Sequence, residues 1–288
     1  MSDPLFAVRN NFYLGAFNTV LNEASDIDSL TDLEQIDRDA FIYRSYIALG
    51  SYELVISEIK DSAATALQAV KLLAQYTSGK KAKEAVLSTL SEWLGDSACN
   101  RNPTVLLISG IIYAQEGMYE EALKACHVGL NLELMALCVQ VYLKMDRTDK
   151  ADQQLKAMSN VDDDATLTQL ATAWVGTALG GAKVQDAQYI YQEMGDKYNF
   201  TATIYNGRAV CYMKVGDYEE AERDLLEAFN KDAKNAETLS NLITCGLHLG
   251  KNVQRYITQL KMAAPSHPFC KRLENADELF NRAAASMA

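Results

Sequence analysis

The chain has 288 residues, of which 49% are hydrophobic, and its formal net charge is −11. This acidic balance argues against nucleic-acid binding, because phosphate recognition needs clustered Lys and Arg. The longest apolar stretch, residues 105–114, is about half as long as a membrane-spanning helix, and the N-terminus lacks the pattern of a secretory signal. We therefore expect a cytosolic protein without a transmembrane segment.

The N-terminal part of the sequence predicts short antiparallel helices. Residues 5–24 have the pattern of a helical hairpin with Gly15 at its turn. Two further helices are expected near residues 63–77 and 80–95. Between the hairpin and these two helices, a unit that starts near residue 36 matches positions 8, 11, 15 and 17 of the tetratricopeptide repeat. The residue at its position 8 is large, although the repeat has a small residue there. The matching residues are Tyr43, Tyr46, Gly50 and Tyr52.

Residues 202–235 form the clearest tetratricopeptide-like unit. Ala209, Ala221 and Ala228 occupy positions 8, 20 and 27, where small side chains let two antiparallel helices approach closely. Gly216 occupies the turn, where its access to positive φ ends the first helix at low cost. The unit therefore predicts a helix, a tight turn and a second helix.

Other units repeat this pattern with decreasing fidelity. Residues 103–136 match it well, and weaker units follow them. The anchors at position 20 are 29, 36 and 34 residues apart, so one connection is shortened. These anchors are Ala122, Ala151, Ala187 and Ala221.

The pattern fades toward the C-terminus. Arg255 replaces the small residue of position 20 in residues 236–269, and Pro265 and Pro268 precede a last helix at about 269–285, which we expect to cap the array. The sequence thus predicts an all-α fold, a right-handed α-solenoid of about seven degenerate tetratricopeptide-like helix pairs. Its repeats cover about 36–264 within a single domain, residues 1–288, and their uneven spacing allows strong curvature.

Catalytic and metal-binding motifs are missing from the sequence. His127, His248 and His267 are isolated, and the six cysteines contain no CxxC pair and fit reduced core positions. The glycine-rich segment 176–183 lacks the lysine and the preceding strand of a phosphate loop, so it predicts a turn between helices. The carboxylates of residues 162–164 could bind a hard cation, but capping of the next helix is favoured. We expect no enzyme, no cofactor and no metal.

The concave face of such an array is the candidate binding surface. Positions 2, 5, 9, 12 and 13 of the first helices face it, and here they form a set more apolar than a solvated groove tolerates. We expect a protein partner to cover this set, although a tightly curved array could instead bury it. The residues at or beside these positions are Arg44, Ile47, Leu107, Ile111, Ala136, Leu143, Leu179, Asn206, Val210, Met213, Lys214 and Leu247.

Several segments resemble one family, the epsilon subunits of the coatomer coat. They include RDAFIYRSYIALGSYELVISEIK, DATLTQLATAWV and QDAQYIYQEM, and the resemblance covers essentially the full chain. It implies a non-catalytic coat subunit that binds the C-terminal region of the coatomer alpha subunit and meets the other subunits indirectly.

The resemblance also implies a role in retrograde Golgi-to-ER and intra-Golgi vesicle transport, in the cytoplasm and peripherally on Golgi membranes and coated vesicles. The alternative is a tetratricopeptide adaptor or co-chaperone that holds another protein or peptide. The Lys and Asn clamp of carboxylate-binding co-chaperones is absent, because Leu107 and Ile111 occupy those positions in one clear unit and Asn206 and Val210 in the other.

Overall fold

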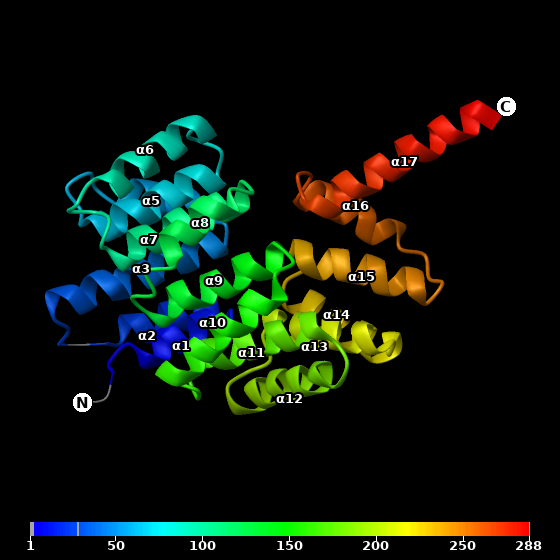
Figure 1. The fold of residues 1–288 in the computed structure, drawn as a ribbon, viewed down its shortest axis with the longest axis horizontal. Coiled ribbons are helices and arrows are strands. Elements are labelled where there is room, and N and C mark those ends of the chain that lie inside the picture. Colours follow the sequence, from blue (N-terminus) through cyan, green and yellow to red (C-terminus); the bar gives the residue numbers. More distant parts are fainter. Residues whose placement is uncertain (1–2, 28, 288) are drawn as a thin grey trace. The chain divides into compact units, whose positions relative to one another are not determined.

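In a computed structural model, which describes residues 3–27 and 29–287, every regular element is an α-helix (Figure 1). The predicted all-α solenoid class is confirmed. Counted along the described chain, the helices make eight consecutive pairs followed by α17, against the expected seven or so. Among these helices, none combines the length and apolar content that crossing a membrane requires.

The chain divides into two compact units, residues 1–179 and 180–288, and each is described by itself. The boundary falls at Gly180 and Gly181, which both have positive φ, in the turn predicted for this glycine-rich segment. The expectation of a single continuous domain stays a prediction.

Unit 1 contains eleven helices that follow one another through short turns. They are α1 (Phe6–Tyr13), α2 (Phe17–Ser25), α3 (Asp32–Ala48), α4 (Tyr52–Glu58), α5 (Thr65–Thr77), α6 (Lys83–Gly95), α7 (Pro103–Gln115), α8 (Tyr119–Cys126), α9 (Leu132–Lys144), α10 (Thr148–Val161) and α11 (Thr166–Leu179). The first two form the expected N-terminal hairpin, with Gly15 at φ +81° in its turn.

The inner helices of unit 1 form a closed series. In sequence order α3, α5, α7, α9 and α11 each pack against the next, and α1 packs against both α3 and α11. Buried apolar side chains fill the space between consecutive helices, among them Ile108, Ile112 and Leu134. The uneven repeats therefore curve enough for the N-terminal hairpin to reach the eleventh helix.

Helix starts in unit 1 are set by local capping. The Thr31 hydroxyl accepts the amide of Glu34, and the Glu34 carboxylate accepts the amide of Thr31, which together form a capping box before α3. Asn102 and Asn131 accept first-turn amides of α7 and α9. These caps fix where α3, α7 and α9 begin.

Unit 2 contains six helices, which are α12 (Ala182–Lys197), α13 (Ala202–Val215), α14 (Tyr218–Lys231), α15 (Ala236–His248), α16 (Gln254–Ala263) and α17 (Pro268–Met287). The turn expected at Gly216 is present, since this residue ends α13 at φ +90° and Asp217 then caps α14. Inside the unit, Arg208 of α13 forms a bidentate ion pair with Asp224 of α14, at 2.7 and 2.6 Å. The best repeat in the sequence is therefore also regular in the structure.

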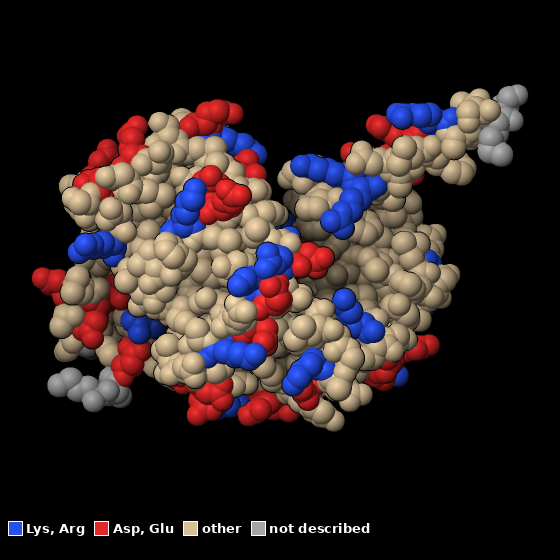
Figure 2. Space-filling model, in the orientation of Figure 1, with Lys and Arg blue, Asp and Glu red and all other residues tan. Residues whose placement is uncertain are grey.

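The surface carries charges of both signs. Over most of the face in Figure 2, Lys and Arg side chains lie singly or beside acidic ones, with one small group over α16. This distribution agrees with the sequence argument against a polyphosphate partner.

We predict that Gly207→Ala destabilises unit 2. A Cβ at this position of α13 would lie 2.4 Å from Tyr191 Cε1 of α12, so the buried ring would have to move. We expect a loss of about 1–3 kcal/mol, although alanine is the better helix former by roughly 1 kcal/mol. Thermal unfolding followed by circular dichroism measures the change.

The matched control is Gly95→Ala in α6, where an added Cβ meets nothing within 4 Å. We expect this variant to unfold at the same or a higher temperature than the wild type. Equal stabilisation by both substitutions would show that α12 and α13 do not approach closely at Gly207.

Candidate functional site: a pocket in unit 1

The candidate site is a pocket of about 870 Å³ in unit 1. Its wall is formed by α1, α3 and the starts of α5, α7, α9 and α11. Because inner helices that pack side by side begin at the same edge, their capping residues and first turns converge on this space. The closed series of helices thus produces an enclosed site from segments that are far apart in sequence.

The contact that closes the wall joins α1 to the start of α11. The Thr166 hydroxyl donates a hydrogen bond to Oδ1 of Asn10, and these residues are 156 positions apart. Asn10 is buried, 5% exposed, so this bond satisfies a polar group that water does not reach. The N-terminal hairpin is therefore part of the pocket wall.

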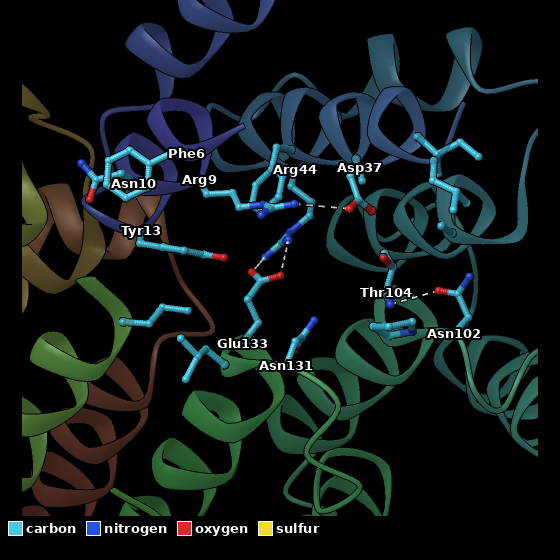
Figure 3. Close-up of a pocket in the computed structure, with 18 of the residues that line it drawn as sticks. Phe6, Arg9, Asn10, Tyr13, Asp37, Arg44, Asn102, Thr104, Asn131 and Glu133 are labelled. Atoms are coloured by element: carbon cyan, nitrogen blue, oxygen red, sulfur yellow. Dashed lines mark hydrogen bonds and ion pairs between the residues drawn. The ribbon is translucent and has the colours of Figure 1, made fainter. Parts of the chain in front are cut away.

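An ion pair crosses the interior of the pocket. Arg44 of α3 donates to both carboxylate oxygens of Glu133 in α9, at 2.8 and 3.3 Å, and the side chains are 10% and 15% exposed. The guanidinium also lies 4.4 Å from the ring centre of Phe12 and 5.0 Å from that of Phe41. Figure 3 shows the Tyr13 hydroxyl and the Glu133 carboxylate directed into the space beside Arg44.

Burial raises the pKa of two other groups that line the pocket. Burial raises the pKa of the Tyr13 phenol far above its usual value, and the Glu133 carboxylate raises it further. Burial also raises the pKa of the Asp37 carboxyl, against the opposing effect of the Arg9 guanidinium. Tyr13 therefore remains a hydrogen-bond donor at neutral pH.

Two large apolar side chains are exposed at the mouth of the pocket, beside the polar residues Asp37, Asn131 and Asp162. Phe6 and Leu33 line the pocket and are 58% and 77% exposed. At the start of α5, Ala64 provides no side-chain cap, so the amides of Thr65 and Ala66 have no side-chain acceptor. The site thus offers apolar contacts at its rim and backbone donors on its wall.

The arginine side chains of the pocket are paired with carboxylates. Within residues 3–27 and 29–287, no three His, Cys, Asp or Glu side chains are grouped so that they could hold a metal ion. Arg9 and Arg44 each face a carboxylate, of Asp37 and Glu133.

Of the twelve residues predicted for the concave face, Arg44 lines the pocket. Ile47, Leu107 and Ala136 lie in the core of unit 1, at 9%, 5% and 4% exposure, so a partner cannot reach their side chains. Ile111 and Leu143 are half-buried; Ile111 packs against the cluster that contains Ile47 and Leu107, and Leu143 against the cluster that contains Ala136. Tight curvature, the alternative weighed for the sequence, accounts for these locations.

The remaining predicted residues lie outside the pocket. Leu179 and Leu247 are 50% and 60% exposed, and Lys214 is also exposed. Asn206 donates to the Thr238 hydroxyl at 2.6 Å, a contact between α13 and α15 inside unit 2. The half-buried side chains of this group are Asn206, Val210 and Met213.

Repeat positions gave no signal for the other pocket residues, such as Tyr13, Asp37 and Glu133. A usable signal lay in the capping residues Asn102 and Asn131, whose separation of 29 residues equals that of the anchors Ala122 and Ala151. Equal spacing indicates that the two helix starts share one edge.

We predict that Glu133→Ala lowers the free energy of unfolding of unit 1 by about 3 kcal/mol, because it leaves the largely buried Arg44 guanidinium without its partner. The double variant Arg44→Met with Glu133→Leu, which removes both charges, should lose much less. Urea unfolding of the three proteins checks this. Equal losses in the single and double variants would mean that the ion pair itself supplies the stability.

Comparisons with known proteins agree with this architecture. The family described as coatomer epsilon subunit matches residues 1–288. The chain is 51% identical to coatomer subunit epsilon-2 of Arabidopsis thaliana, covering 99% of this chain and 97% of that one. It is 52% identical to coatomer subunit epsilon-1 of Oryza sativa subsp. japonica, covering 99% of both.

A solved structure supports the fold alone. A tetratricopeptide repeat protein from Parabacteroides merdae matches with a TM-score of 0.58 and 16% identity, over 89% of this chain and 98% of that one. The repeat pattern of the sequence and the helix packing of the structure thus agree with an independent tetratricopeptide architecture.

Proposed function

The chain belongs to the coatomer epsilon subunit family, a family of non-catalytic coat components, and we propose that it binds the C-terminal region of the coatomer alpha subunit through the pocket of unit 1. In this proposal the alpha subunit inserts a polypeptide segment into the pocket. The other coat subunits are then reached through the alpha subunit.

The observation that carries the proposal is the pocket with two large apolar side chains exposed at its mouth. Leu33, at 77% exposure, and Phe6, at 58%, would lose water contact when a polypeptide covers them. The amides of Thr65 and Ala66 would donate hydrogen bonds to carbonyl groups of an entering segment.

Membership of the family supports a wider role. We propose that the protein acts in vesicle transport from the Golgi to the endoplasmic reticulum and within the Golgi, located in the cytoplasm and on Golgi membranes through the coat. The exposed concave residues Leu247 and Lys214 of unit 2 remain candidates for additional contacts.

We predict that Leu33→Glu weakens binding of the purified C-terminal region of the alpha subunit at least about tenfold, because a carboxylate would be desolvated at the mouth of the pocket. Isothermal titration calorimetry measures the affinity. Leu33 is largely exposed in the free chain, so circular dichroism should show an unchanged helical signal.

Leu49→Glu is the matched control, since this leucine ends the same helix, α3, is 43% exposed and does not line the pocket. It should bind with wild-type affinity. Wild-type binding by Leu33→Glu, or equal weakening by both variants, would refute the pocket as the binding site for the alpha subunit. Absence of any binding by the wild type, with chaperones recovered instead from cytosol, would favour the adaptor alternative.

A further inference from the structure

The last helix, α17, leaves most of its own apolar face uncovered. Its first turn is anchored, because Cys270 is 2% exposed and Phe269 packs in the core that contains Leu239 and Ile243. Beyond Cys270, every residue whose side chain is described is exposed except Leu273, which is half-buried. The helix therefore extends past the packing of unit 2 without a neighbour in the described chain.

The uncovered part is nevertheless amphipathic. Its apolar residues recur at alternating intervals of three and four residues, which is the heptad spacing of a coiled coil. In heptad notation Leu273 and Phe280 occupy a, and Ala276 and Ala283 occupy d. Phe280 is 72% exposed, and the neighbouring Leu279, at g, is 62% exposed. A continuous apolar stripe of this kind needs a helical partner to exclude water.

We propose that the partner is a second copy of the chain and that two α17 helices pair in parallel as a short coiled coil. In this arrangement each a and d residue packs against the same residue of the partner helix. A residue at g faces the e residue of the partner helix that lies five positions later in the sequence. The pairing depends on the part of α17 that follows Cys270 and not on the pocket of unit 1.

The flanking charges favour this pairing. Arg272 occupies g and Asp277 occupies e, which are five positions apart, so Arg272 of each copy would face Asp277 of the other, and the twofold axis would generate this pair twice. Both side chains are exposed, and neither forms an ion pair within the described residues. The next g–e pair, Leu279 with Ala284, is apolar on both sides.

An antiparallel pair fits these residues less well. Antiparallel packing could place Phe280 of one copy over Ala276 of the other. In that register Asp277 of one copy would face Asp277 of the other, because e positions face e positions in antiparallel coiled coils. The like charges would repel, and Arg272 would have no acidic partner. The parallel arrangement satisfies both charged positions.

An anionic membrane is a poorer partner for this helix. After Cys270, α17 carries three acidic side chains and three basic ones, and Figure 2 shows both signs along it. Interfacial helices that bind anionic lipid carry mainly Lys and Arg on their polar face. The mixed charges suit a protein helix.

Sedimentation equilibrium of the full chain over a concentration series tests the proposal. We expect a reversible monomer–dimer equilibrium in the wild type and a monomer for Phe280→Glu. Asn281→Glu adds the same charge one residue later, at b, on the exposed outer face, and should dimerise like the wild type. A wild type that stays monomeric, or a dimer that Phe280→Glu leaves intact, would overturn the proposal.

Charge exchange tests the direction of the helices. Arg272→Asp and Asp277→Arg should each weaken the dimer about tenfold, because each replaces two attractive pairs with two repulsive ones. Combining the two substitutions should restore the wild-type dissociation constant. A double variant as weak as the singles, or singles without effect, would contradict parallel pairing.

Discussion

The contact between α1 and α11 is the constraint on which unit 1 depends. A pair of repeat helices buries its apolar faces only against neighbouring pairs, so an open array leaves an exposed face at each end. In unit 1, α1 packs against both α3 and α11, with Asn10 accepting a hydrogen bond from Thr166. The N-terminal hairpin thereby covers the two ends of the inner series at once.

The closed packing of the inner helices also determines which of their side chains are buried and where accessible space remains. In a wide solenoid the inner positions of the first helices line an open groove. In unit 1 the curvature is so tight that Leu107 and Ala136 become core, and the available space moves to the edge where the helices begin. The Arg44–Glu133 ion pair then links α3 to α9 across that space. The result is a pocket lined by both apolar and polar side chains, with Phe6 and Leu33 exposed at its mouth.

The sequence allowed the helices to be predicted because their signals are local. Gly216 with Asp217 marks a turn, and the spaced alanines mark close helix contacts. The pocket could not be predicted in this way, since Asn10 and Thr166 are 156 residues apart and belong to no short pattern. Repeat positions placed Ile47 on an open face because they assume regular curvature, whereas Ile47 packs in the core of unit 1.

The central claim is that the pocket of unit 1 holds a segment of the alpha subunit, and hydrogen exchange tests it most directly. The amides of Thr65 and Ala66 lack side-chain acceptors at the start of α5, so they should exchange rapidly in the free chain. Mass spectrometry of the chain bound to the C-terminal region of the alpha subunit should show protection there and at the start of α3. Protection confined to unit 2, with no change at these helix starts, would contradict the account.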